Sequence, residues 1–130
     1  MDAAHLLSPG EVKTLTAQSA ALEQRTKHQF VVVTVTSLGG QDVADFSAAL
    51  GNRLGIGRKG INDGVLLVVA PAEGKVRIAV GDGLTKVLTN DEARVIVEQT
   101  LIPAFKARHF GEGIVKGSDQ IVAQLSETGA

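Results

Sequence analysis

The stretch that decides the fold is NDGVLLVVAPAEGKVRIAVGDG, residues 62–83. Its apolar runs flank the turn signal Pro71-Ala72-Glu73-Gly74, a pattern typical of a β-hairpin over about residues 64–80. With the turn centred between Ala72 and Glu73, antiparallel pairing places one set of alternate residues on a single apolar face: Val65, Leu67, Val69, Val76, Ile78 and Val80. A slip by one residue would move this set to the opposite face, so the burial pattern supports the register independently of the turn.

The same register places Asp63 opposite Asp82 at the open end of the hairpin. Carboxylates that face each other across a strand pair repel, so the pair indicates a cation, a shared proton or a basic group nearby. A helix start, Thr89-Asn90-Asp91-Glu92, follows after a short loop and adds another acid. Because Ca²⁺ takes several oxygen ligands at once, we expect these groups to converge on a divalent cation. The candidate metal ligands are Asp63, Asp82 and Asp91, supported by Asn62 and the carbonyls of Gly81 and Gly83.

The same acids also have a purely structural interpretation. Asp63 precedes a glycine in a turn, Asp82 lies within a Gly-Asp-Gly turn, and Asp91 interacts with a helix dipole. Two nearby basic residues, Arg58 and Arg77, are candidates to bind a phosphate or to pair with the carboxylates. Arg58 also fits a solvated loop, and Arg77 also fits a cross-strand or inter-layer partner. Both interpretations remain open from the residues alone.

Helices and a further strand precede the hairpin. Ser8-Pro9-Gly10-Glu11 is a capping-box start and predicts a helix from about Pro9 to Arg25. Its predicted buried stripe consists of Val12, Leu15, Ser19 and Leu22. Residues 29–36 form an apolar run without polar alternation, which predicts a central strand covered on both faces. A second helix is predicted over residues 42–54.

Further helices follow the hairpin. The Thr89 start predicts a helix that runs to Pro103, where the chain kinks or restarts. The last predicted helix covers residues 111–126, and its Gly113 and Gly117 would allow close packing on the sheet. This order of elements predicts one domain, residues 1–130, in which a mixed sheet has helices on both faces. The expected fold is therefore an α/β fold with a three-layer α/β/α sandwich, and its ligands are expected at strand ends near helix starts.

Composition excludes several classes of function. The chain has no cysteine, which excludes disulfides, thiolate metal sites and cysteine nucleophiles. Its 13 basic and 14 acidic residues are spread along the sequence with a net charge of −1, so no nucleic-acid partner is expected. No apolar run has the roughly 18–20 residues of a membrane span. The histidines His5, His28 and His109 lack zinc-ligand spacing, and no Gly-x-Ser-x-Gly or P-loop motif occurs.

Ordered motifs along nearly the whole chain resemble the TPM domain family, which is found in thylakoid-lumen photosystem repair proteins and in bacterial envelope proteins. The matching motifs are DAAHLLSP at residues 2–9, FVVVTV at 30–35, GIG at 55–57, NDGVLL at 62–67, VRI at 76–78, VG-x-GL at 80–84, LT-x-D at 88–91 and IPAF at 102–105. The resemblance implies a Rossmann-like three-layer fold, in agreement with the order of elements.

The resemblance also implies properties of the site. In some family members the acidic loops bind Ca²⁺, and their residues fall here on Asp63 and Asp91, beside the Gly81-x-Gly83-Leu84 turn. Some members are described as weak acid phosphatases. Members are often extracytoplasmic, with a signal peptide before the domain and a membrane anchor after it, and neither is expected within the chain as given. Many members carry Glu where this chain has Thr85, and Asp82 stands where an aromatic residue is common.

We therefore expect a binding or accessory module with a calcium site at Asp63, Asp82 and Asp91, which acts with a protein partner at the envelope or a membrane surface. The alternative is a weak metal-assisted acid phosphatase at the same site, in which Arg58 or Arg77 balances the charge of the transition state. A third interpretation is a structural domain whose acids serve only as caps and turn residues. No residue is assigned a catalytic role.

Overall fold

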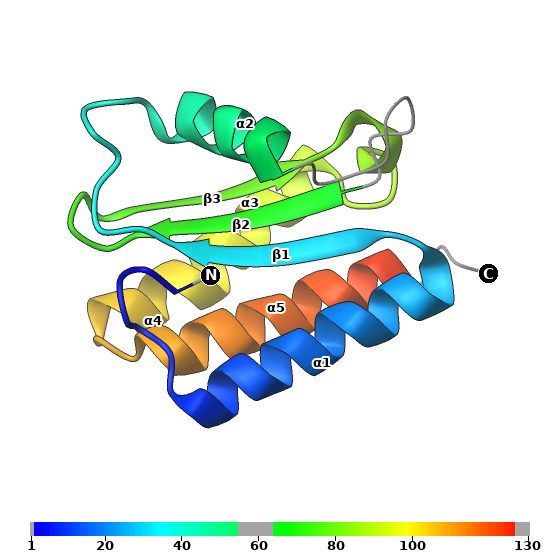
Figure 1. The fold of residues 1–130 in the computed structure, drawn as a ribbon, viewed down its shortest axis with the longest axis horizontal. Helices are drawn as coiled ribbons and strands as arrows, with labels where there is room; N and C mark the ends of the chain where they lie inside the picture. The colour runs from blue at the N-terminus through cyan, green and yellow to red at the C-terminus, as the bar shows by residue number, and fades with distance from the viewer. Residues whose placement is uncertain (1, 55–63, 127–130) are drawn as a thin grey trace.

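The structure, a computed structural model, describes residues 2–54 and 64–126. Its elements alternate between helices and strands up to the hairpin and are helical afterwards (Figure 1). In chain order they are α1 (Pro9–Thr26), β1 (Gln29–Thr34), α2 (Val43–Leu54), β2 (Gly64–Ala70), β3 (Lys75–Val80), the 3₁₀ turn η1 (Asp82–Leu84), α3 (Asn90–Ile96), the π-helical segment η2 (Val97–Leu101), α4 (Ile102–Lys106) and α5 (Phe110–Ser126).

The sheet has the strand order β1-β2-β3, with β1 parallel and β3 antiparallel to β2. The predicted hairpin register is confirmed: the pairs are Val65 with Val80, Leu67 with Ile78 and Val69 with Val76. These residues all pack in or against one core cluster, between the sheet and the helices below it. Leu66, Val68 and Ala79 face the opposite side, as the alternation requires. The turn and the apolar alternation were therefore sufficient to specify the pairing.

The prediction that the first strand is central is wrong. β1 is an edge strand, and β2, which is buried at every residue, lies in the middle. The apolar run of β1 has another cause, because helices cover both faces of the sheet. Phe30 of β1 belongs to the cluster that contains residues of α1, whereas Val33 belongs to the cluster that contains Leu50 of α2. A run without polar alternation thus reports which faces are covered and not how many strands lie beside it.

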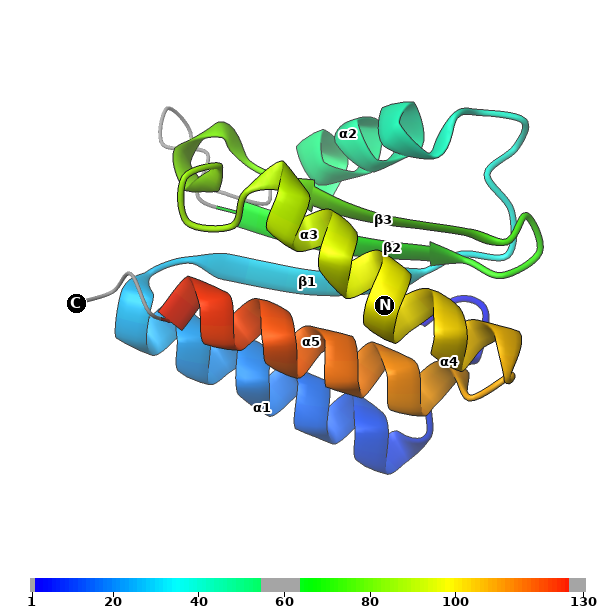
Figure 2. The ribbon, with the colours of Figure 1, turned by 180° about the vertical axis from the view of Figure 1, so that it is seen from behind.

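The helices form the outer layers of the sandwich, which confirms the three-layer prediction. In Figures 1 and 2, α2 lies on one face of the sheet, and the remaining helices lie on the other, with α1 and α5 side by side. The larger core lies between the sheet and this four-helix layer and includes Leu22, Leu67 and Ile121, all fully buried. Apolar burial on both faces is the main stabilising term of such an arrangement.

The start of α1 follows the predicted capping box. The Ser8 hydroxyl accepts a hydrogen bond from the Glu11 amide at 3.1 Å, and the Glu11 carboxylate accepts one from the Ser8 amide at 2.9 Å. Leu15 and Leu22 of the predicted stripe are buried. Val12 is a correction, since 42% of it is exposed. It lines a surface cleft near the start of α1 instead of reaching the core.

Pro103 restarts the helix, as predicted, through a local widening of the backbone. The five residues of η2 form a π-helical turn, and the Ile102 amide donates to the Val97 carbonyl. A proline within an α-helix removes one hydrogen bond and clashes with the carbonyl four residues earlier. The π turn absorbs this conflict and leads into α4 with Pro103 in its first turn.

The glycines of α5 allow close packing, but not on the sheet. A Cβ atom on Gly117 would lie 2.7 Å from Cδ2 of Leu101, and one on Gly113 would lie 2.6 Å from Cβ of Ala104. Both neighbours belong to the η2–α4 segment. The expectation that these glycines pack against the sheet is therefore corrected: helix–helix contact within one layer requires them.

Ser118 of α5 provides a stability test of this layer. The side chain is fully buried, and among the described residues its hydroxyl has no hydrogen-bond partner. Removing an unsatisfied buried hydroxyl removes a desolvation penalty, so Ser118→Ala is expected to raise the free energy of unfolding by about 1 kcal/mol. The matched control is Ser47→Ala, because the buried Ser47 hydroxyl donates to the Val43 carbonyl at 2.7 Å.

Urea unfolding of both variants measures the difference. Ser47→Ala loses its hydrogen bond and is expected to be less stable than the parent protein by about 1 kcal/mol. Equal losses in the two variants would mean that the Ser118 hydroxyl has a partner after all, such as an ordered water molecule.

Candidate functional site

The open end of the hairpin is held together by backbone hydrogen bonds. The Gly81 amide donates to the Gly64 carbonyl at 2.8 Å, which extends the pairing one step beyond Val80. The Gly81 carbonyl in turn accepts from the Leu84 amide at 2.9 Å and closes the η1 turn. The start of β2 and the chain that leaves β3 are therefore neighbours at one end of the sheet.

The structure describes the backbone of one of the two acids predicted to face each other at this end, but not the other. Asp82 is the first residue of η1, so its backbone turns away from the strand direction and does not continue β3. Asp63, Asn62 and Arg58 lie outside the described residues. The predicted opposition of Asp63 and Asp82 thus stays a prediction, whereas the Gly64–Gly81 contact beside it is present.

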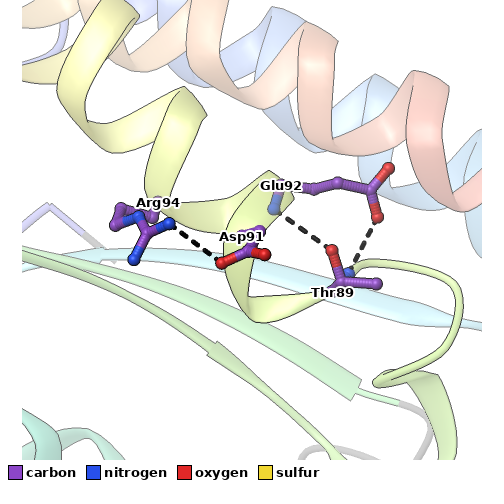
Figure 3. Close-up of polar contacts among 4 residues, drawn as sticks. All are labelled: Thr89, Asp91, Glu92 and Arg94. Atoms are coloured by element: carbon purple, nitrogen blue, oxygen red, sulfur yellow. Dashed lines mark hydrogen bonds and ion pairs between the residues drawn. The ribbon is translucent and has the colours of Figure 1, made fainter.

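Asp91 lies in the first turn of α3, next to a second capping box (Figure 3). The Thr89 hydroxyl accepts from the Glu92 amide at 3.2 Å, and the Glu92 carboxylate accepts from the Thr89 amide at 2.9 Å. Asp91 pairs instead with Arg94, whose Nη2 lies 2.9 Å from Oδ1. This ion pair was not predicted, although its i,i+3 spacing on a helix is a recognisable signal.

The Asp91–Arg94 pair leaves the carboxylate available to other ligands. The side chains are 83% and 64% exposed, respectively, so water screens their attraction. An ion pair of this kind contributes less than about 1 kcal/mol. Asp91 therefore fits both sequence-based interpretations, because it stabilises the start of α3 and also presents oxygen atoms to solvent.

Arg77 lies near the middle of β3, and a cleft connects it with the Gly64–Gly81 end of the sheet. It pairs with Val68 in the hairpin register, is exposed, and lines a cleft of about 370 Å³ between α2 and the hairpin. Asn52 of α2, Gly64 and Gly81 line the same cleft. Among the described residues no carboxylate lines it. The cleft is therefore a basic and polar recess next to the Gly64–Gly81 contact.

The described residues do not by themselves complete a metal site. Within residues 2–54 and 64–126, no group of three or more His, Cys, Asp or Glu side chains is placed to hold a metal ion. Of the predicted ligands, Asp91 contributes a described carboxylate, and Gly83 is exposed in η1. The Gly81 carbonyl already accepts a hydrogen bond from the Leu84 amide. A cation site here depends on the acids that flank these residues in the chain.

Within residues 2–54 and 64–126, the carboxylate that accepts the most hydrogen bonds belongs to Asp2, which the sequence did not single out. Its Oδ1 accepts from the Leu6 amide at 2.9 Å and from the Thr34 hydroxyl at 2.5 Å, and its Oδ2 accepts from the Leu7 amide at 2.9 Å. Thr34 is fully buried and also accepts from the Ala4 amide at 3.0 Å. These bonds tie the N-terminal segment to the end of β1 that is opposite the Gly64–Gly81 contact.

Asp2 is held in its ionised form. Burial alone would raise its pKa, but the hydrogen bonds from Thr34, Leu6 and Leu7 and the charge of His5 lower the pKa below its ordinary value of 3.8. These partners all belong to the fold itself. We therefore interpret Asp2 as a structural residue and not as part of the candidate site.

Comparison with known proteins identifies the family. The family model of the TPM domain matches residues 1–124. A segment of 60 residues is 37% identical to the UPF0603 protein YdjH of Bacillus subtilis (strain 168), a match that covers 46% of this chain and 24% of that protein. The chain thus matches about a quarter of the length of this curated relative.

Solved structures agree in fold. The NMR structure of the N-terminal domain of a P. gingivalis protein has a TM-score of 0.90 and 28% identity, with 98% of this chain and 81% of that chain covered. The BA42 protein from Bizionia argentinensis has a TM-score of 0.75 and 23% identity, with 93% and 82% covered. Within the described ranges, no helix has the length and apolar character needed to cross a bilayer. The chain belongs to the TPM domain family.

Proposed function

We propose that this TPM domain is a binding module that holds a Ca²⁺ ion at Asp63, Asp82 and Asp91 and presents that end of the sheet to a protein partner. The observation that carries the proposal is the hydrogen bond of 2.8 Å from the Gly81 amide to the Gly64 carbonyl. Asp63 is covalently joined to Gly64 and Asp82 to Gly81, so this bond limits how far the two backbones can separate.

The chemistry of the donors supports calcium rather than a softer metal. The candidate ligands are carboxylate, amide and carbonyl oxygens, and the chain has no cysteine. A cation would also relieve the repulsion between neighbouring carboxylates. By family resemblance, we place the partner outside the cytoplasm, at the envelope or at a membrane surface. The existence of this protein partner is also proposed.

A calcium titration of the ¹⁵N-labelled protein tests the site. We expect saturable shifts of the amide signals of residues 81–85 and 91, and loss of one carboxylate in Asp63→Asn or Asp91→Asn should weaken binding about tenfold. Arg94→Gln should strengthen binding, because it removes the cation that pairs with Asp91. Glu98→Gln is the matched control, since this exposed acid lies on η2, away from the site.

Absence of shifts at millimolar Ca²⁺ would contradict the proposal and favour the structural interpretation of the acids. Equal weakening by Glu98→Gln would also contradict it, because the effect would then follow net charge and not the ligand set.

The cleft beside Arg77 favours one alternative, a metal-assisted phosphomonoesterase. A cation at the acids would polarise the phosphoryl oxygens, and Arg77 or Arg58 would bind the phosphate and balance its charge. Turnover of an aryl phosphate should then collapse in Asp63→Asn and Asp91→Asn, and Arg77→Gln should raise KM. Activity that persists in all three variants would exclude this site as its source.

A further inference from the structure

A second cleft, of about 440 Å³, lies at the opposite end of the sheet from the proposed calcium site. It is formed by the turn between β2 and β3 together with α4 and the start of α5. Figures 1 and 2 show this hairpin turn and α4 at the same end of the molecule. Its size is within the range of small-molecule pockets.

The floor of this cleft is apolar. Val69 and Ala70 at the end of β2 are fully buried below it. The rings of Phe105 and Phe110 lie with their centroids 5.3 Å apart and form one wall. Ile102 of α4 also lines the cleft and is 37% exposed. An apolar ligand group that covered Ile102, Phe105 and Phe110 would remove their exposed parts from water, which is the main favourable term in such binding.

The rim is positively charged. Lys75 on β3, Lys106 at the end of α4 and Arg108 after it are all exposed and line the cleft. Among the described residues no carboxylate lines it. Glu73 of the adjacent turn accepts from the Leu38 amide at 2.7 Å and is directed to that loop. The rim therefore attracts an anion without an acid of its own to neutralise it.

Arg108 holds its place on this rim at a conformational cost. Its backbone has a φ of 63°, in the left-handed region, where glycine is favoured. The hydrogen bonds are those of a Schellman motif at a helix C-terminus. The Arg108 amide donates to the Phe105 carbonyl at 3.0 Å, and the His109 amide donates to the Ala104 carbonyl at 2.8 Å. Glycine is the usual residue here, and the chain instead carries a cationic side chain that lines the cleft.

We propose that this cleft binds a small anionic amphiphile, a molecule with an apolar chain or ring and one anionic head group. The apolar part would cover Ile102, Phe105 and Phe110, and the head group would lie among Lys75, Lys106 and Arg108. Charge complementarity selects the anionic head, and the apolar floor and wall select a ligand with an apolar body over a simple ion. The proposal is independent of the proposed calcium site, whose candidate residues lie at the other end of the sheet.

The probe is decanoate, titrated below its micelle concentration into the ¹⁵N- and methyl-labelled protein. We expect saturable shifts of the Ile102, Val69 and Val76 methyl signals. Acetate tests the head group without the chain, and decyltrimethylammonium tests a similar chain with the opposite charge. Neither is expected to shift these signals. Equal binding of decyltrimethylammonium, or the absence of shifts with decanoate, would overturn the proposal.

Variants of the rim residues distinguish a loss of positive charge at the cleft from a loss of folding stability. Arg108→Gly removes one cation and relieves the backbone strain, so it should weaken decanoate binding about fivefold while it keeps or raises Tm. Lys106→Gln should weaken binding similarly, and Lys86→Gln, an exposed change outside this cleft, should not. Unchanged affinity in both Arg108→Gly and Lys106→Gln would overturn the assignment. Shifts of these signals by anionic lipid vesicles or by an acidic peptide, with none from decanoate, would also overturn it.

Discussion

Replacing Asp2 with alanine is expected to lower the free energy of unfolding by about 3 kcal/mol at neutral pH, because three hydrogen bonds to one carboxylate are lost. The loss leaves the Leu6 and Leu7 amides and the buried Thr34 hydroxyl without their acceptor. These bonds also fix the N-terminal segment on the edge of β1, where Asp2 bridges Thr34 and the Ala3 amide donates to the Thr34 carbonyl at 3.1 Å. Urea unfolding measures the change.

The matched control is Asp45→Ala. Asp45 is an exposed acid in the first turn of α2, so its loss removes a helix-dipole interaction of less than about 1 kcal/mol. Thr34→Val tests the other partner, since it keeps the shape of the side chain and removes the hydroxyl. If Asp2→Ala costs no more than Asp45→Ala, the bonds to Asp2 do not contribute to the stability of the fold.

The effect of Asp2 should also depend on pH in a defined direction. The folded state lowers the pKa of Asp2 below 3.8, so it binds a proton less readily than the unfolded chain does. The resulting stabilisation is fully present above the unfolded pKa and is lost as the pH falls through the folded pKa. The difference in unfolding free energy between the parent protein and Asp2→Asn should therefore shrink from about pH 5 to about pH 2. A constant difference across this range would mean that folding does not lower the pKa of Asp2.

Features specified by neighbouring residues could be predicted from the sequence. The hairpin register follows from the turn at Pro71 and the apolar alternation on either side of it, and it is confirmed. Both capping boxes, at Ser8 and Thr89, join residues three positions apart and are present. The restart of the helix at Pro103 follows from the missing amide of proline. In each case the decisive interaction lies within one turn or one strand pair.

Features that depend on distant residues could not be predicted in this way. Asp2 and Thr34 are 32 positions apart, and nothing local marks Asp2 as the acceptor for a buried hydroxyl. The edge position of β1 depends on which strands pair with it, whereas its apolar run reflects only the helices that cover both faces of the sheet. Gly113 signals a close approach, but only the assembled layer shows that the neighbour is α4 and not the sheet.

One part of the candidate site follows from neighbouring residues, and another part depends on residues that are distant in the sequence. The register correctly brings Gly64 and Gly81 together and places Arg77 opposite Val68. The cleft beside Arg77 requires the packing of α2 over the hairpin, which is a tertiary feature. The basic cleft at the other end joins Lys75 with Arg108, which are 33 positions apart in the numbering and belong to elements that meet only in the fold. Sequence spacing therefore located one end of the sheet and overlooked the other.

Gly113→Ala is expected to lower the free energy of unfolding by about 2 kcal/mol, although alanine is the better helix former by about 1 kcal/mol. A Cβ atom at this position would lie 2.6 Å from Cβ of Ala104 and 3.3 Å from Cε1 of Phe105. The Ala104 Cβ is attached directly to the backbone and cannot rotate away, so α4 and α5 must separate to admit the new methyl group.

Gly51→Ala is the matched control for this substitution, because Gly51 lies within α2 and a Cβ there would have no neighbour within 4 Å. The control should gain up to about 1 kcal/mol from helix propensity alone, so the two substitutions are expected to have opposite signs. The reciprocal change Ala104→Gly should make Gly113→Ala less costly than it is in the parent protein, since it removes the atom that the new methyl group meets. Additive effects of Gly113→Ala and Ala104→Gly in urea unfolding would contradict a direct contact, because residues that do not touch are not coupled.

Phe105, the next nearest neighbour of this contact, also lines the basic cleft. The absence of a side chain at Gly113 therefore helps to set the position of the wall that the proposed amphiphile would contact.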